Sequence, residues 1–277
     1  MKYKVLAVDF DGTLLRSDRT VSVETINALK RYKDCGGKVV LCTGRIFNSI
    51  KPEAEKLGLS GEIYCYQGSA LYDIESGARR AHIPVPPKHV KDICTFFEDK
   101  DIYFQTYVDD VIFCKKFTEE GNYYYENFCK GARFATNVPL STYFEKHPDC
   151  KATKILAIVD DERIEGLIEE ILDKFGHVVT AFRSEKGFLE VISSRSGKGN
   201  ALLTYCKQCG VDVKDAVAIG DSMNDIPMIK NAGLGIAMGN ARDAIKEVAD
   251  YVCDTNDNDG VAKVIDMIIN GTFEMTM

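Results

Sequence analysis

Short apolar runs alternate with helix-like stretches near both ends of the chain. KVLAVDF begins at Lys4 and is followed by VETINALKRYKDCGG, and KVVLC begins at Lys38 and is followed by IFNSIKPEAEKLG. Late in the chain, DAVAIGD precedes a helix that we expect from about Asn224. Strands that alternate with helices in this way form βα units, whose strands pair in parallel. The pattern therefore predicts an α/β fold with a doubly wound, mostly parallel, Rossmann-like sheet.

The middle of the chain breaks this rhythm. HIPVPPKHV contains three prolines, which suits a connector better than a helix or a strand. We expect a second connector at FRSEKG, residues 182–187. Helix-like stretches lie between the two connectors, at about 88–99, 118–130 and 162–175. We therefore predict a core built from residues 1–84 and 186–277, with an α+β cap domain inserted at residues 85–185.

Composition and charge exclude several classes of function. The 277 residues carry a net charge of −7 and no basic run, which argues against a nucleic-acid partner. The apolar runs are far shorter than a membrane span, so we expect no membrane partner. The start, MKYKVLAVDFDG, does not resemble a secretory signal, and the ten cysteines are scattered as expected for reduced thiols. Together these features predict a cytoplasmic protein.

Polar residues follow three of the predicted strands. They form the clusters Asp9-Phe10-Asp11-Gly12-Thr13, Thr43-Gly44-Arg45 and Gly220-Asp221-Ser222-Met223-Asn224-Asp225. Ligands of open α/β sheets bind beyond the carboxyl ends of the strands, so we expect all three clusters at one edge. Four carboxylates would meet there, those of Asp9, Asp11, Asp221 and Asp225. Their repulsion calls for a cation, and oxygen ligands alone favour Mg²⁺.

Lys198 is the candidate for a positive charge at the same edge. It lies in SRSGKGNALL, between the strand-like FLEVI and an apolar-periodic helix, so we expect it near a helix N-terminus, where anions are favoured. Gly197 and Gly199 permit a ligand to approach closely. The GKG sequence alone is a weak signal, because most lysines lie on the surface. Together with the three strand ends, it indicates a site for phosphate.

Four motifs in order resemble those of one family. DFDGTLL, LCTGR, SGKGNAL and GDSMND are similar to the four motifs of haloacid dehalogenase superfamily phosphatases. GLGIAMGNA and NDNDGVA resemble further stretches of the Cof-type group, whose members carry an inserted C2-type cap. The match spans nearly the whole chain, and each motif follows the kind of strand that it requires.

The resemblance implies a Mg²⁺-dependent phosphomonoester hydrolase that acts through an aspartyl-phosphate. Asp9 would be the nucleophile and Asp11 the general acid and base. Phosphate would be held by Thr43, Gly44, Lys198 and Asn224. The metal would be bound by the Asp9 side chain, the Asp11 backbone carbonyl and Asp221, with Asp225 supporting these ligands. The substrate would be a small soluble phosphorylated metabolite, with sugar phosphates as the first class to consider.

Two alternative functions use similar residues. A phosphosugar mutase would form the same aspartyl-phosphate and return the phosphoryl group to the sugar. A signalling receiver protein also uses an acceptor aspartate, Mg²⁺, a threonine and a lysine on a doubly wound sheet. Receivers are much shorter than this chain and lack a second aspartate two residues after the acceptor. The sequence leaves the substrate and the oligomeric state open; the chain would be a monomer or a small homo-oligomer.

One residue departs from the resemblance near the site. Cof-type sequences often have Asn-Gly-Ala after the third strand, whereas this chain has YQGSALY, with Gln67 before Gly68. Any function that the family's asparagine carries is therefore in doubt here.

Overall fold

The computed structural model describes residues 1–129 and 131–274, and it contains two β-sheets. Within those residues, the first sheet has eight strands in the order β14-β13-β12-β1-β2-β3-β4-β5. Its strands are β1 (Val5–Val8), β2 (Lys38–Cys42), β3 (Glu62–Cys65), β4 (Ala70–Asp73), β5 (Arg79–His82), β12 (Ala216–Gly220), β13 (Leu234–Ala237) and β14 (Tyr251–Val252). Pairing is parallel from β14 to β3 and antiparallel for β4 and β5. The predicted α/β class and mostly parallel sheet are confirmed.

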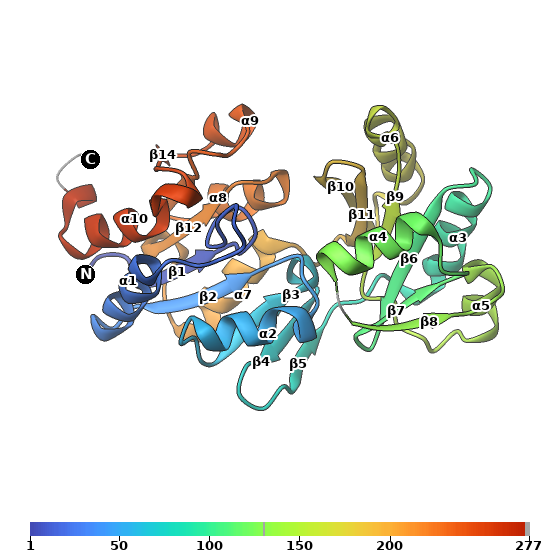
Figure 1. Cartoon of the computed structure of the whole chain (residues 1–277), viewed down its shortest axis with the longest axis horizontal. Helices are drawn as coiled ribbons and strands as arrows, with labels where there is room; N and C mark the ends of the chain where they lie inside the picture. The colour runs from blue at the N-terminus through green and yellow to red at the C-terminus, as the bar shows by residue number, and fades with distance from the viewer. Residues whose placement is uncertain (130, 275–277) are drawn as a thin grey trace.

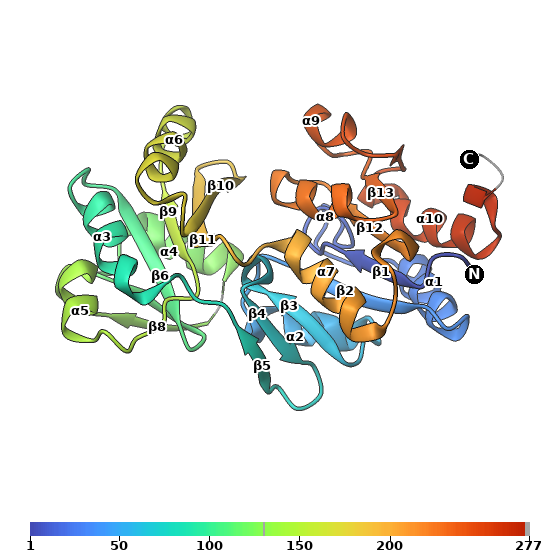
Figure 2. The same cartoon turned by 180° about the vertical axis from the view of Figure 1, so that it is seen from behind.

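Helices cover both faces of the first sheet (Figures 1 and 2). On one face lie α1 (Val23–Asp34), α2 (Phe47–Lys56) and α10 (Gly260–Ile269); on the other lie α7 (Lys198–Cys209) and α8 (Ile226–Asn231), while α9 (Asp243–Lys246) follows β13. Successive side chains of β1 pack against the helices on opposite faces of the sheet, since Leu6 and Val8 belong to one buried cluster and Val5 and Ala7 to another. An apolar strand without alternation is what such burial on both faces requires.

The first helix is bounded by its own sequence. Ser22 precedes α1, and its hydroxyl oxygen accepts a hydrogen bond of 3.0 Å from the Thr25 backbone N–H. A cap of this kind stabilises a helix by about 1 kcal/mol. Gly36 follows the helix with a φ of 83°, a left-handed conformation that glycine adopts without strain.

The second sheet is built from the middle of the chain. Its order is β10-β11-β9-β6-β7-β8, and its pairing is antiparallel except between β7 and β8. The strands are β6 (Tyr103–Val108), β7 (Val111–Cys114), β8 (Ala132–Ala135), β9 (Ile155–Ile158), β10 (Val179–Glu185) and β11 (Phe188–Ser193). The helices are α3 (Pro87–Glu98), α4 (Glu119–Phe128), α5 (Leu140–Lys146) and α6 (Ile164–Phe175). Residues of α3, α5 and α6 form one buried cluster with the sheet.

The expected second connector at residues 182–187 is wrong. This segment lies within a β-hairpin, in which β10 pairs with β11 in an antiparallel register. Gly187, with a φ of 80°, forms part of the turn. Because β11 also pairs with β9, the chain leaves the second sheet only after Ser193.

The two sheets and their helices form two lobes that are in contact (Figure 1). Residues of the second lobe, among them Tyr107 and Phe188, belong to the same buried apolar cluster as the core of the first lobe. The ring of Tyr66 meets the ring of Tyr107 edge-on, with centroids 5.6 Å apart. The N-terminus and α10, the last α-helix of the described residues, lie on the first lobe, away from the second. Among the described residues, no helix combines the length and the apolar character that crossing a membrane requires.

Candidate active site

Parallel pairing of β1 with β12 brings two acidic strand ends together. Val8 lies opposite Ile219, and the Asp9 backbone N–H donates to the Ile219 carbonyl oxygen at 3.1 Å. Asp221 follows one residue after the end of β12. Gly12 has a φ of 73°, and a Cβ atom there would lie 2.5 Å from a carboxylate oxygen of Asp221. Only glycine therefore lets the loop after β1 pass so close to this carboxylate.

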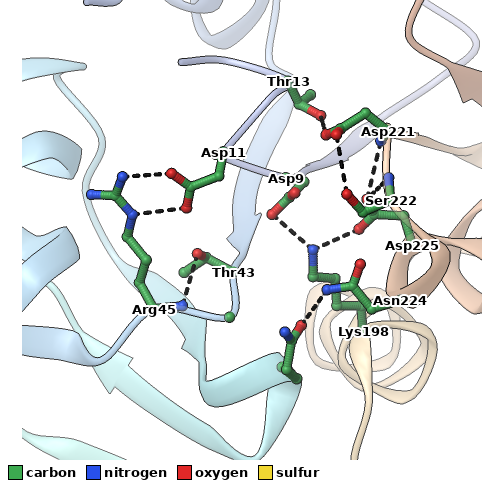
Figure 3. A network of polar contacts seen from close by, with 12 residues as sticks. Asp9, Asp11, Thr13, Thr43, Arg45, Lys198, Asp221, Ser222, Asn224 and Asp225 are labelled. Atoms are coloured by element: carbon green, nitrogen blue, oxygen red, sulfur yellow. Dashed lines mark hydrogen bonds and ion pairs between the residues drawn. The ribbon is translucent and has the colours of Figure 1, made fainter. Parts of the chain in front are cut away.

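Lys198 is the first residue of α7 and lies between two carboxylates. Its Nζ atom is 2.8 Å from Asp9 Oδ1 and 2.6 Å from Asp225 Oδ1 (Figure 3). The three side chains are almost completely buried, with Lys198 only 1% exposed. A buried ammonium group is tolerated only where it is paired, and here it has two acidic partners.

Asp225 holds the loop that follows β12. Its Oδ2 atom accepts hydrogen bonds from the backbone N–H groups of Asp221 (3.1 Å) and Ser222 (2.9 Å). Asp221 in turn accepts hydrogen bonds from the hydroxyl groups of Thr13 at 2.7 Å and Ser222 at 3.1 Å (Figure 3). The position of each carboxylate is thus determined by several donors.

The electrostatics of this cluster are dominated by negative charge. Burial raises the pKa of Asp9 well above its usual value, and Asp225 and Asp221 add to the rise, against the opposing effect of Lys198. Burial, together with Asp225, raises the pKa of Asp221 to about 7. Burial acts to lower the pKa of Lys198, but Asp225 and Asp9 shift it upward overall. Three carboxylates share one ammonium group, so a further positive charge would stabilise the cluster.

The donor set fits a divalent metal ion. Oxygen atoms of Asp9, Asp221 and Asp225 all lie within 4.8 Å of one another. Oxygen-only donors and an excess of negative charge suit a hard cation such as Mg²⁺. Both oxygens of Asp225 accept hydrogen bonds, from Lys198 and from fixed backbone N–H groups. The two oxygens of Asp221 accept from hydroxyl groups, which can rotate away, so Asp9 and Asp221 are the freer ligands.

Asp11 lies on the other side of Asp9 and is paired with arginine. Arg45 donates to both of its carboxylate oxygens, from Nε at 2.8 Å and from a terminal nitrogen at 2.5 Å (Figure 3). The Asp11 side chain is 48% exposed, unlike that of Asp9. Thr43, which is fully buried, accepts a hydrogen bond of 3.1 Å from the Arg45 backbone N–H. The loop after β2 is therefore linked to the loop after β1.

A cavity of about 270 Å³ lies between the two lobes. The first lobe contributes Asp9, Asp11, Gly44, Lys198 and Asn224 to its lining, and the second lobe contributes Tyr124, Lys154, Phe188 and Glu190. Both acidic residues of the DFDGT motif thus face a space that the second lobe covers.

Comparison with known proteins identifies the family. The profile of haloacid dehalogenase-like hydrolases matches residues 6–265. The chain belongs to this family. It is 29% identical to a phosphatase of Bacillus subtilis (strain 168), over 95% of this chain and 98% of that protein. It is 31% identical to the 5-amino-6-(5-phospho-D-ribitylamino)uracil phosphatase YcsE of the same organism, over 95% and 94%.

A solved structure agrees with these relatives. A haloacid dehalogenase-like hydrolase from Bacteroides thetaiotaomicron superposes with a TM-score of 0.79 at 30% identity, covering 96% of this chain and 99% of the other. The resemblance inferred from the four motifs is confirmed. The protein is a haloacid dehalogenase-type phosphatase.

Asn224 directly precedes Asp225, and its side chain is hydrogen-bonded to a residue outside the acidic cluster. Its amide nitrogen donates a hydrogen bond of 2.7 Å to the side-chain oxygen of Gln67, the residue that departs from the Cof-type pattern. The Asn224 side-chain oxygen is buried without a protein partner, although Asn224 lines the cavity. This oxygen is available to a ligand or to an ordered water molecule.

The sequence did not point to two charged residues of the cavity. Lys154 and Glu190 lie in the second lobe, 1% and 4% exposed, with Nζ and Oε2 2.9 Å apart. Each is a charged residue beside or within an apolar run, ATKILAIV and FLEVI. A charge in a predicted buried strand signals a buried partner, but the sequence does not say which residue that partner is.

Proposed function

We propose that this phosphatase is a Mg²⁺-dependent phosphomonoester hydrolase that works through an aspartyl-phosphate on Asp9. The observation that carries the proposal is the position of the Asp9 carboxylate. It lines the cavity, contacts Lys198, and lies beside Asp221 and Asp225. A buried carboxylate next to a cation site and an ammonium group is suited to attack phosphorus while the phosphoryl charge is neutralised.

The reaction divides between two carboxylates. In the first step, an oxygen of Asp9 bonds to phosphorus, the ester P–O bond breaks, and Asp11 gives its proton to the departing oxygen. In the second step, Asp11 takes a proton from water as the water oxygen attacks phosphorus, and the Asp9–phosphorus bond breaks. Both oxygens of Asp11 accept bonds from Arg45, so the guanidinium group must release this carboxyl group before it can donate a proton.

The remaining predicted residues would hold the phosphoryl group and the metal ion. We assign Thr43, Gly44, Lys198 and Asn224 to the phosphoryl oxygens. We assign Mg²⁺ to the Asp9 side chain, the Asp11 carbonyl oxygen and the Asp221 side chain. Asp225 keeps Asp221 and Lys198 in place through the hydrogen bonds described above. Bound Mg²⁺ would supply the positive charge that the three carboxylates lack.

The second lobe is proposed as an inserted cap that excludes water and contacts the leaving group. The sequence predicted its limits as residues 85 and 185. The pairing of β11 with β9 and β10 supports a later limit, near Ser193. The core would then consist of residues 1–84 and about 194–277.

The substrate is proposed to be a small soluble phosphorylated metabolite. The cavity of about 270 Å³ lies below the 300–1,000 Å³ that drug-sized ligands occupy. Sugar phosphates come first because of the Cof-type resemblance, and the name of one relative contains a phosphorylated ribityl chain. We expect a cytoplasmic monomer or small homo-oligomer with no nucleic-acid or membrane partner.

The test is a phosphate-release screen with and without Mg²⁺. The panel contains sugar phosphates, nucleotides, pyridoxal phosphate, flavin mononucleotide and 5-amino-6-(5-phospho-D-ribitylamino)uracil. We expect Mg²⁺-dependent release from at least one small phosphomonoester. Isomerised sugar phosphate without free phosphate would favour the mutase instead. No release with any compound would contradict the proposal.

A further inference from the structure

A buried ion pair of the second lobe connects two loops of the first lobe. Lys154 lies just before β9 and Glu190 lies in β11, and these two strands are paired. Lys154 and Glu190 neutralise each other, whereas the acidic cluster around Lys198 has excess negative charge. A pair of opposite charges that balance does not need a metal ion. Any role of Lys154 and Glu190 at the site therefore rests on the hydrogen bonds that they make with the first lobe.

The first contact joins Lys154 to the loop after β2. The Lys154 ammonium group donates a hydrogen bond of 3.2 Å to the Gly44 carbonyl oxygen. Gly44 lies between Thr43, proposed to bind phosphate, and Arg45, which holds Asp11. A shift of the second sheet would therefore move or break a hydrogen bond to this loop.

The second contact joins Glu190 to the loop after β12 through Gln67. The Gln67 amide nitrogen donates to Glu190 Oε1 at 3.3 Å, and the Gln67 oxygen accepts from Asn224 at 2.7 Å. Gln67 is 3% exposed and has a φ of 59°, so its backbone is held in a strained conformation. A Cβ atom on Gly44 would collide with the Gln67 amide nitrogen. The absence of a side chain at Gly44 is what allows the Gln67 amide to lie there.

An amide is the group that these two neighbours require. It accepts a hydrogen bond from Asn224 with its oxygen and donates one to Glu190 with its nitrogen, which a carboxylate cannot do. We propose that Gln67, Glu190 and Lys154 form a positioning relay, which couples the seating of the second lobe to the groups that hold phosphate, Gly44 and Asn224. The relay rests on the proposed function, and its residues need not touch the reacting atoms.

The relay predicts that the amide and the carboxylate can be exchanged. In Gln67→Glu, two carboxylates face each other. In Glu190→Gln, the introduced amide nitrogen must face a donor, either the Gln67 amide nitrogen or the Lys154 ammonium group, so one hydrogen bond is lost. In the double variant, the carboxylate introduced at position 67 can accept from Asn224 and from the amide introduced at position 190. The oxygen of that amide can accept from Lys154. The exchange restores every hydrogen bond of the relay and preserves the net charge, while the carboxylate that balances Lys154 moves from position 190 to position 67.

The experiment measures KM, kcat and the inhibition constant of inorganic phosphate at 25 °C, with the thermal midpoint measured separately. Interaction energies between residues in one hydrogen-bond network correspond to changes of roughly 2- to 150-fold in a binding constant. We expect each single variant to weaken phosphate binding about tenfold, and the double variant to recover to within about threefold of the parent. Glu145→Gln is the matched control, because Glu145 is an exposed cap carboxylate paired with Lys91. It should change none of these constants.

Two outcomes overturn the relay while leaving the proposed function intact. One is a lower thermal midpoint in the single variants with an unchanged phosphate constant, since that result indicates a purely structural role. The other is a folded double variant that recovers no phosphate binding. If the single variants do not fold, Gln67→Asn keeps the amide but shortens it by one methylene, and an unchanged phosphate constant in that variant also overturns the relay. An inactive parent enzyme would contradict the proposed function instead.

Discussion

Two buried lysines face the same cavity, and their surroundings differ in charge. Lys198 contacts Asp9 and Asp225 beside a third carboxylate, that of Asp221. Lys154 contacts one carboxylate, that of Glu190, together with a backbone carbonyl group. Both lysines are 1% exposed, so burial alone does not distinguish them.

The difference in charge suits the two lysines to different proposed roles: Lys198 to the reaction, and Lys154 to positioning the second lobe. A cluster with more carboxylates than ammonium groups attracts a metal ion and raises carboxyl pKa values, which active sites use. A pair of one positive and one negative charge is neutral by itself, and we propose that this pair positions the second lobe on the first. Mutations in the first environment should therefore impair the reaction itself, and mutations in the second should impair seating and stability.

The largest effect is expected at Asp9. Asp9→Asn removes the proposed nucleophile and should lower kcat by roughly 10⁴-fold or more, the scale seen when hydrolases lose such a group. Amide and carboxylate have similar size, so the circular dichroism spectrum should remain that of the parent. Asp266→Asn is a matched control, because Asp266 is an exposed helical aspartate paired with Arg31. Substantial residual turnover in Asp9→Asn would remove the nucleophile assignment.

Asp11 should have a smaller effect on the same reaction. Asp11→Asn removes proton transfer but keeps the nucleophile, so we expect kcat to fall by roughly 10²- to 10⁴-fold. Arg45→Lys serves as a comparison, since it keeps the charge but loses the two-point contact with Asp11. An unchanged rate in Asp11→Asn, measured by initial phosphate release, would exclude a general acid–base role.

Substitution of Lys154 should mainly lower the stability of the fold, in contrast to the substitutions near Lys198. Lys154→Met leaves the Glu190 carboxylate buried without its partner and should lower the free energy of unfolding by about 3–5 kcal/mol. Replacing both residues, Lys154→Met with Glu190→Leu, should recover most of that loss, because no buried charge remains. Denaturant unfolding measures both values. Phosphate binding should stay weak in the double variant if the pair has a positioning role.

The smallest effect is the dependence of metal stabilisation on pH. The Asp221 pKa of about 7 lies above its usual value of 3.8, so the metal-free folded protein binds this proton more tightly than the unfolded chain does. The stability from this proton is complete below about pH 3.8 and is lost as the pH rises through about 7. Mg²⁺ competes with the proton, so its stabilisation should be greater at pH 8 than at pH 5.

Thermal unfolding with and without Mg²⁺ at the two pH values checks this expectation. A Mg²⁺ concentration of 100 times its Kd would raise the free energy of unfolding by about 2.7 kcal/mol at most. An equal gain at pH 5 and pH 8 would contradict a carboxylate site for the ion. Asp221→Asn should abolish the gain, whereas Lys154→Met should retain it, because Lys154 and Glu190 are not among the proposed metal ligands.

Much of the fold was predictable because its signals are local. Apolar runs, helix periodicity and the cap at Ser22 depend on residues within a few positions of one another, and they identified the parallel sheet. The hairpin at residues 182–187 was missed for a related reason. A glycine turn between two apolar stretches is compatible with a connector or with a hairpin, and only strand pairing shows which is present.

The sequence by itself determined that Asp9, Asp221 and Asp225 meet at the ends of β1 and β12, since parallel strands of similar length bring their carboxyl ends to one edge. The fourth carboxylate expected there, that of Asp11, is turned to Arg45 instead. Only the tertiary structure decided that Lys154 contacts Gly44 and that Glu190 contacts Gln67. These partners are 110 and 123 positions apart in the chain. Their contact depends on how the second lobe packs on the first, and packing of two separate sheets leaves no periodic pattern in either segment.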